Sequence, residues 1–189
     1  MMTHRQALEI VARRRADKIV VTTMTSAGIW PELSDTPLDF PYLPSAMGQG
    51  PALGLGLALA QERGVIVVNG DGSTLMNLGC LATIAGHPAN LFVIIMVNGI
   101  YEVTGGQQIA AVDFAAVAAG CGIKRIYAFS SLDQWAAEAE AALSGAGPVV
   151  IALKVEARFG QKTPKPRRPM NDQITRLRER LAAPPAHRS

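Results

Sequence analysis

Two unbroken apolar runs of strand length constrain the fold of this chain more than any other feature. They occupy residues 64–68 and 91–97, and each ends abruptly in polar and glycine residues. Runs without polar alternation are typical of strands that are buried on both faces of a parallel sheet. Between them, residues 73–86 carry apolar side chains close to helical spacing, and Ser73 stands where an N-cap would begin a helix. A strand, a helix and a second strand in this order predict a parallel pair with a helical crossover.

The same alternation of strand and helix patterns continues along most of the chain. It predicts strands near residues 18–22, 125–129 and 149–155, and helices near 3–15, 50–62, 113–121 and 132–143. The segment between the first strand and the helix near 50–62 is interpreted as a proline-rich loop that holds Pro31, Pro37, Pro41 and Pro44. The expected class is α/β, with a three-layer, mostly parallel open sheet and helices on both faces.

Polar residues follow both apolar runs, and their types suit a metal ion. Asp71 comes after the first run and Asn98 after the second, with 25 residues between Gly72 and Asn98. The carboxyl ends of neighbouring parallel strands meet at one sheet edge, where open α/β sheets bind ligands. Carboxylate and amide oxygens suit Mg²⁺, and glycines at 70 and 72 let backbone N–H groups approach phosphate oxygens. Either half alone is also a common turn dipeptide, so the joint pattern carries the prediction.

This motif resembles the cofactor-binding motif of the thiamine-diphosphate enzymes, in which a Gly-Asp-Gly triplet is followed at similar spacing by an asparagine, often one of a pair. The resemblance implies that Asp71 and Asn98 bind Mg²⁺ through their side chains and Ile100 through its backbone oxygen. The chain departs from the usual asparagine pair, because Val97 stands in the first position. The retained second asparagine is the one that binds the metal in the family.

A wider likeness extends over most of the chain, to the cofactor-binding half of sulfopyruvate and phosphonopyruvate decarboxylases. The matching stretches are residues 45–48, 70–73, 76–79, 88–91 and 105–107. The resemblance implies that Met47 wedges between the two cofactor rings and that the Ser45 carbonyl meets the aminopyrimidine. The alternative for Met47 is a core gap-filler. The full set of cofactor contacts that the resemblance implies is Thr23, Thr25, Ser45, Met47, Gly48, Gly70, Gly72, Ser73 and Tyr101.

Thr23 and Thr25 resemble the hydroxyl residues that meet the diphosphate, although Met24 stands where the nearest relatives have a glycine-lysine pair. Glu102 is the one carboxylate near the expected site in sequence. It is a candidate catalytic residue that orients substrate or relays a proton, and the alternative is a cap of the following turn near the surface. Some single-chain relatives carry a catalytic glutamate at the position of Thr104, so that role cannot be transferred here.

Thiamine catalysis in the family also needs a glutamate from a separate pyrimidine-binding domain, for which 189 residues leave no room. The resemblance therefore implies a hetero-oligomer, in which a partner subunit supplies that glutamate and the complex decarboxylates a small 2-oxo acid. Two alternatives are a non-catalytic scaffold or regulatory subunit that keeps the cofactor grip, and a dinucleotide-binding module. The second is suggested by glycines at 48–50 and 54–56, but neither pair completes the GxGxxG pattern.

Charge divides the chain into an expected cofactor-binding domain over residues 1–156 and a basic, proline-rich extension over 157–189. The first part holds nine Lys/Arg and thirteen Asp/Glu, and the second holds nine and two. A helix pattern at Ile174, Leu177 and Leu181 predicts a short helix in the extension. Phosphate neutralisation by nucleic acid is one interpretation of its charge, and a solvated extension that packs on a neighbouring subunit is the favoured one.

The remaining composition predicts a cytoplasmic protein that binds neither membrane nor nucleic acid. No secretory signal or long apolar segment is present in the sequence. Cys80 and Cys121 stand in apolar surroundings and are expected in the core, and no Cys/His cluster suggests zinc or iron–sulfur chemistry. His4, His87 and His187 are far apart, so surface or loop positions are expected for them.

Overall fold

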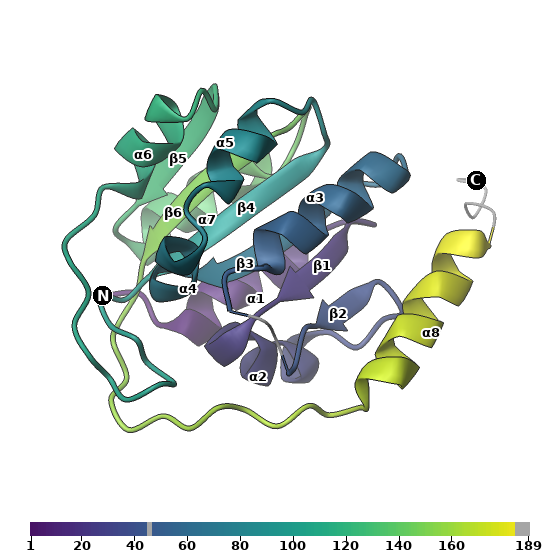
Figure 1. Cartoon of the computed structure of the whole chain (residues 1–189), viewed down its shortest axis with the longest axis horizontal. Coiled ribbons are helices and arrows are strands. Elements are labelled where there is room, and N and C mark those ends of the chain that lie inside the picture. Colours follow the sequence, from purple (N-terminus) through teal and green to yellow (C-terminus); the bar gives the residue numbers. More distant parts are fainter. Residues whose placement is uncertain (45–46, 184–189) are drawn as a thin grey trace.

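The computed structural model describes residues 1–44 and 47–183 and contains one six-stranded sheet in the order β2-β1-β3-β4-β6-β5 (Figure 1). Every pairing in this sheet is parallel. The expected mostly parallel open sheet is therefore confirmed. The strands are β1 (Ile19–Thr22), β2 (Asp39–Pro41), β3 (Val65–Gly70), β4 (Leu91–Val97), β5 (Arg125–Phe129) and β6 (Val149–Lys154).

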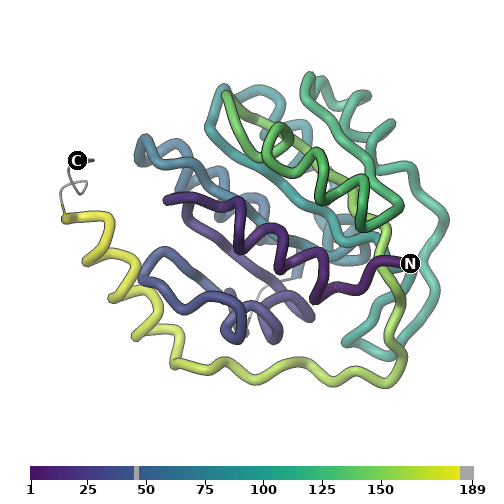
Figure 2. Tube along the Cα trace, turned by 180° about the vertical axis from the view of Figure 1, so that it is seen from behind, coloured from purple at the N-terminus to yellow at the C-terminus, as the bar shows by residue number. Residues whose placement is uncertain are grey.

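Helices cover both faces of the sheet, as expected for a three-layer α/β fold. One face carries α1 (His4–Arg14), α2 (Met24–Leu33) and α7 (Leu132–Ala142), and Figure 2 shows α1 and α7 lying across it. The other carries α3 (Gly50–Ala60), α4 (Asp71–Met76), α5 (Cys80–Ala85) and α6 (Phe114–Gly120). The last helix, α8 (Met170–Ala182), lies beside β2 at the sheet edge.

The central strands explain why the two apolar runs dominate the sequence. Val65 and Val67 of β3 belong to the core on one face, and Ile66 and Val68 belong to the core on the other. All four side chains are fully buried. A strand covered on both faces has no solvent-facing position, so it needs no polar alternation.

The register of β3 against β4 brings the two polar motifs together. Gly70, the last residue of β3, lies opposite Met96, the penultimate residue of β4. Asp71 and Asn98 therefore leave the sheet side by side at its carboxyl edge, as the strand–helix–strand pattern predicts.

The predicted helix over residues 73–86 forms as two short helices. Asp71 begins α4, whose N-cap is Gly70, so the prediction that Ser73 caps the helix is wrong. The first helix ends at Met76, and the side-chain amide of its C-cap residue, Asn77, donates to the Gly48 carbonyl at 3.2 Å. Asparagine and glycine between the two helices favour such a break because they compete poorly for the helical conformation.

The interpretation of the proline-rich segment as a loop is wrong over two stretches. Helix α2 contains Pro31, and β2 pairs with β1. Trp30 is fully buried beneath the sheet, and this burial outweighs the cost of a proline near the helix end. Asp39 at the start of β2 is held by a buried ion pair with Arg15, and an edge strand accepts Pro41 at its last position.

The basic extension contains the predicted helix, but it packs on its own chain. Residues 157–169, which we call the strap, run along the carboxyl edge of the sheet to α8 (Figures 1 and 2). Leu177 of α8 is buried in the same core as Phe40 of β2. The two terminal guanidinium nitrogens of Arg168 donate to the Asp35 carboxylate at 2.6 Å, and a terminal nitrogen of Arg176 donates to it at 3.2 Å. Part of the basic charge of the extension thus pairs with Asp35 in the acidic part of the chain.

No helix within residues 1–44 and 47–183 is long and apolar enough to cross a bilayer. Cys80 is buried, as expected, and Cys121 is partly buried.

The contact between α3 and β3 predicts opposite effects for two glycines of one helix. A Cβ on Gly54 would lie 2.2 Å from Val67 Cγ2, whereas a Cβ on Gly56 meets nothing within 4 Å. We expect Gly54→Ala to lower the free energy of unfolding by about 1–3 kcal/mol through overpacking. Gly56→Ala should raise it by about 0.5–1 kcal/mol through helix propensity. Urea unfolding of the two variants measures both, and equal effects would contradict this packing.

The Asp35 cluster predicts a pH-dependent attachment of α8. Hydrogen bonds from Arg168, ahead of the opposing effect of burial, lower the pKa of Asp35 to about 2. A lowered folded-state pKa means that this carboxylate stabilises the docked helix above its unfolded pKa of about 3.9. The contribution is lost as pH falls through about 2. The protection of residues 170–182 against hydrogen exchange, corrected for the intrinsic pH dependence of exchange, should fall over that range, and in Asp35→Asn it should already be low at pH 7. Glu138→Gln, a change at an exposed residue of α7, should leave this protection high.

Candidate cofactor site

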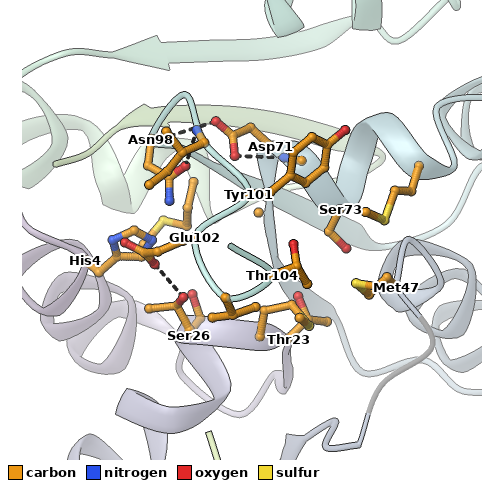
Figure 3. Close-up of a pocket in the computed structure, with 18 residues that line it drawn as sticks. His4, Thr23, Ser26, Met47, Asp71, Ser73, Asn98, Tyr101, Glu102 and Thr104 are labelled. Carbon is orange, nitrogen blue, oxygen red and sulfur yellow. Dashed lines mark hydrogen bonds between the residues drawn. The ribbon is translucent and has the colours of Figure 1, made fainter. Parts of the chain in front are cut away.

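A pocket opens at the carboxyl edge of the sheet, where α1, α2, α4 and the loop after β4 converge (Figure 3). It gathers most of the residues that the sequence singled out, although they come from separate segments. Gly48 lies beside it, and Ser45 falls outside the described residues. The predicted residues that line the pocket are Thr23, Thr25, Met47, Gly70, Asp71, Gly72, Ser73, Asn98, Ile100, Tyr101 and Glu102.

The Asp71 carboxylate joins the ends of β3 and β4. One oxygen accepts from the Gly72 N–H at 2.8 Å, and the other accepts from the N–H groups of Asn98 at 2.9 Å and Gly99 at 2.7 Å. Asp71 is 1% exposed. Burial raises the pKa of this carboxyl, while the backbone donors act in the opposite direction. The three hydrogen bonds fix the carboxylate at the place where the two strands end.

Asn98 and Ile100 form a compact turn beside this carboxylate. The Asn98 side-chain oxygen accepts from the Ile100 N–H at 3.0 Å, and Gly99 between them has φ of 80°. A positive φ at this position favours glycine, which keeps the Asn98 side chain and the Ile100 backbone close to Asp71.

The oxygen donors of this turn fit a magnesium ion with phosphate ligands. One carboxylate, one amide oxygen and backbone carbonyls are hard donors, and Mg²⁺ completes its octahedron with water and phosphate oxygens. Within the described part of the chain, no group of three or more His, Cys, Asp or Glu residues could hold a metal. The donor chemistry thus favours a metal that arrives with a phosphate-bearing cofactor over a zinc site.

Gly72 is required by the close approach of Tyr101. A Cβ on Gly72 would lie 2.6 Å from Tyr101 Cδ1. The Tyr101 N–H donates to the Gln107 carbonyl at 2.8 Å, and the Ile109 N–H donates to the Gly99 carbonyl at 3.0 Å. The second glycine of the motif therefore allows a hydrogen-bonded loop, residues 99–109, to close over the start of α4.

Met47 stands at the pocket, and the segment after it is fastened to α4. The Gly48 N–H donates to the Ser73 hydroxyl at 2.9 Å, while the Asn77 amide holds the Gly48 carbonyl. Met47 itself is 43% exposed. This exposure contradicts the alternative of a core gap-filler and leaves the side chain available to a bound cofactor.

The hydroxyl groups of the two threonines predicted to contact a diphosphate have hydrogen-bond partners within the chain. Thr23 Oγ lies 2.8 Å from the Asn69 side-chain oxygen and 3.2 Å from the Val68 carbonyl. Thr25 Oγ donates to the Glu102 carboxylate at 2.5 Å. Between them, Met24 has φ of 48°, a strained value for a residue with a side chain.

Glu102 is a buried wall residue, so the alternative of a cap near the surface is wrong. It is 6% exposed. Besides the bond from Thr25, its carboxylate accepts from the Arg158 N–H in the strap at 2.8 Å. Glu102 therefore links α2, the loop after β4 and the strap, three segments that surround the pocket.

His4 lines the same pocket and is 4% exposed, so the expected surface position is wrong. It stands beside Glu102 in Figure 3. A signal for its burial was present in the sequence, because His4, Ala7, Leu8 and Val11 follow the i, i+3, i+4, i+7 spacing of a buried helix face.

Comparison with known proteins identifies the same region. Residues 21–153 match the family described as thiamine pyrophosphate enzyme, C-terminal TPP binding domain. The chain is 36% identical over 161 residues to a sulfopyruvate decarboxylase subunit beta from Methanothermobacter thermautotrophicus, covering 82% of this chain and 83% of that protein. It is 38% identical over 171 residues to a phosphonopyruvate decarboxylase from Streptomyces viridochromogenes, covering 89% of this chain.

These relatives differ in how much of their length the chain covers. The chain spans 43% of the Streptomyces viridochromogenes protein and 29% of a Streptomyces hygroscopicus phosphonopyruvate decarboxylase, to which it is 47% identical over 117 residues.

The fold has a counterpart among solved structures. An X-ray structure of a thiamin diphosphate-dependent enzyme from Mycobacterium smegmatis superposes with a TM-score of 0.71 at 25% identity, covering 82% of this chain and 32% of that one. With the matched domain, the relatives and the pocket at the carboxyl edge, the chain belongs to the thiamine pyrophosphate enzymes and carries their C-terminal TPP binding domain.

Proposed function

We propose that this chain is the cofactor-binding subunit of a two-subunit, thiamine-diphosphate-dependent decarboxylase. The observation that carries the proposal is the joining of Asp71 and Asn98 at one pocket with an exposed Met47. The chain matches most of the length of two sulfopyruvate decarboxylase beta subunits, which supports the role of a subunit rather than that of a complete enzyme. The substrate in this proposal is a small 2-oxo acid, of the sulfopyruvate or phosphonopyruvate type that the relatives' names give.

In this proposal Asp71, Asn98 and the Ile100 carbonyl hold Mg²⁺, and the glycines at 70 and 72 admit the diphosphate to the backbone. Ser73, Gly48 and Tyr101 shape the pocket around it, and Met47 supports the bend of the cofactor. When bound, thiamine diphosphate supplies an electron sink. It accepts the electron pair of the C–C bond that breaks when the substrate carboxylate leaves as CO₂.

The proposal assigns the remaining acid–base chemistry to a partner chain. Both carboxylates that line the pocket in the described part of the chain already accept hydrogen bonds, Asp71 from three backbone groups and Glu102 from Thr25 and Arg158. Met47 and Met76 at the pocket are 43% and 47% exposed. An apolar rim of this kind suits a pyrimidine-binding partner that closes over the cofactor and brings the family's glutamate.

The proposal also keeps the expected domain division, with a cofactor-binding domain at residues 1–156 and an extension at 157–189, and a cytoplasmic location. The strap contacts Glu102 from outside the first part, so the extension would support the pocket wall.

A non-catalytic scaffold that binds the cofactor is the second candidate. This scaffold would have the same metal site as the proposed enzyme subunit, but its complex would show no turnover. The dinucleotide-binding alternative loses its basis, because Gly54 and Gly56 lie inside α3 and Gly54 packs on Val67 instead of facing a ligand.

Removal of the proposed metal ligands tests the proposal directly. We expect Asp71→Ala and Asn98→Ala to weaken Mg²⁺-dependent binding of thiamine diphosphate by about 100-fold, because each loses a contact to a charged group. Isothermal titration calorimetry on the chain mixed with its partner measures the affinity, and CO₂ release from sulfopyruvate or phosphonopyruvate measures turnover. Asp133→Asn on α7 is the matched control. Full turnover by the Asp71→Ala complex would contradict the proposed site, and cofactor binding without turnover by the unaltered complex would favour the scaffold.

The contact of Gly72 with Tyr101 predicts a second, steric effect. Gly72→Ala places a methyl group into the Tyr101 ring and should displace the loop of residues 99–109. We expect cofactor affinity to fall about tenfold, with a loss of about 1–3 kcal/mol in unfolding free energy from overpacking. Gly56→Ala, at a position that also has nothing within 4 Å, should leave the affinity unchanged and should raise the unfolding free energy slightly. Equal behaviour of the two variants in titration calorimetry and urea unfolding would count against this role of Gly72.

A further inference from the structure

His4 is brought to the pocket by the anchoring of the amino-terminal segment. Met2 forms a bridge with Val155, and the Glu156 N–H donates to the Met2 carbonyl at 3.0 Å. Thr3 caps α1 with a capping box, so the helix begins at His4. Since β6 ends at Lys154, these bonds fix His4 at the same sheet edge as Asp71 and Asn98.

The imidazole has an unused polar atom in this position. His4 is 4% exposed, and its Nδ1 has no hydrogen-bond partner among the residues that the structure describes. An unsatisfied buried polar atom destabilises the folded state, so native proteins rarely keep one that has no function. Burial lowers the pKa of His4, ahead of the opposing effect of Glu102. The ring is therefore neutral at pH 7 and still carries one N–H donor.

Three of the hydroxyl groups that line the pocket, those of Thr23, Thr25 and Ser73, differ in where their protons point. Thr25 gives its proton to Glu102, and Thr23 has two acceptors at hydrogen-bond distance, the Val68 carbonyl and the Asn69 amide oxygen. Ser73 accepts a hydrogen bond from Gly48, so its own proton remains available. A diphosphate offers acceptors alone, so among these three hydroxyls the free proton of Ser73 suits it best.

The amino end of α2 faces the same space. Met24, Thr25 and Ser26 of its first turn line the pocket, and Thr23 makes no side-chain capping bond to that turn. The first N–H groups of a helix lack partners within the helix and attract anions. A buried imidazole beside an uncapped helix end offers several N–H donors, which suits the binding of a phosphate group.

We propose that His4 is a phosphate-binding residue of this pocket, which donates a hydrogen bond to the diphosphate of the cofactor together with the hydroxyl of Ser73. The inference rests on the proposed cofactor role and extends it to a residue on α1. It assigns a ligand contact to the amino-terminal helix, which lies on the opposite face of the sheet from α4.

The variant His4→Leu tests the role because it removes the donor and keeps the volume. Titration calorimetry of the full chain with pyrophosphate and Mg²⁺ should show about 10–100-fold weaker binding, the value of a hydrogen bond to a charged group. His87→Leu is the matched control, since His87 is exposed. Binding by His4→Leu within twofold of the unaltered chain would overturn the proposal.

A stability measurement separates a binding role from a structural one. Because Nδ1 is unpartnered, leucine should leave the ligand-free unfolding free energy unchanged or raise it, while affinity falls. If stability and affinity fall together in His4→Leu, a measurement on the unaltered chain decides between the two roles. Its His4 imidazole signals in nuclear magnetic resonance should shift on saturation with pyrophosphate and Mg²⁺, while those of His87 stay in place. Unmoved His4 signals, or signals that respond to pyruvate and not to pyrophosphate, would overturn the proposal.

Failure of the cofactor role would look different. An unaltered chain that binds neither pyrophosphate nor thiamine diphosphate with Mg²⁺ would overturn the proposed cofactor and the role of His4 with it. Normal binding by both the unaltered chain and His4→Leu overturns the role of His4 alone.

Discussion

The carboxylate of Asp71 is the interaction on which the site depends. It accepts backbone hydrogen bonds from Gly72, Asn98 and Gly99, and so ties the start of α4 to the loop after β4. A buried carboxylate is costly unless donors compensate it, and three N–H groups do so here. The same bonds hold the carboxylate at the strand ends, where a metal ion can use its remaining lone pairs. The hydrogen bonding of this sheet edge and the proposed metal site thus share one side chain.

The walls of the pocket come from segments that are distant in sequence. Glu102 receives hydrogen bonds from Thr25, 77 residues earlier, and from Arg158, 56 residues later. The strap that carries Arg158 then passes α2, where Pro164 lies against Gly28 and Arg167 donates to the Pro31 carbonyl at 2.6 Å. Two walls of the pocket are therefore held by the extension that the charge pattern separated from the domain.

The sequence predicts structure best where the pattern of neighbouring residues alone indicates a buried strand and its end. The strands β3 and β4 follow from their apolar runs, and the meeting of Asp71 with Asn98 follows from parallel pairing. Helix α2 and strand β2 could not be predicted from local pattern, because the burial of Trp30 and the ion pair of Arg15 with Asp39 depend on the folded sheet. The burial of Glu102 likewise depends on partners far along the chain. His4 is the exception, since its helical spacing with Ala7, Leu8 and Val11 was visible and was outweighed by its separation from the other histidines.

Paramagnetic broadening by Mn²⁺ in place of Mg²⁺ is the most direct test of the proposed site, because it locates the metal in the folded chain. With thiamine diphosphate present, we expect strong broadening of the amide signals of Gly72, Asn98 and Gly99. The amide of Gly64, which precedes β3 at the opposite sheet edge, should stay sharp. Broadening centred elsewhere, or equal broadening at both edges, would contradict a metal and diphosphate site at Asp71 and Asn98.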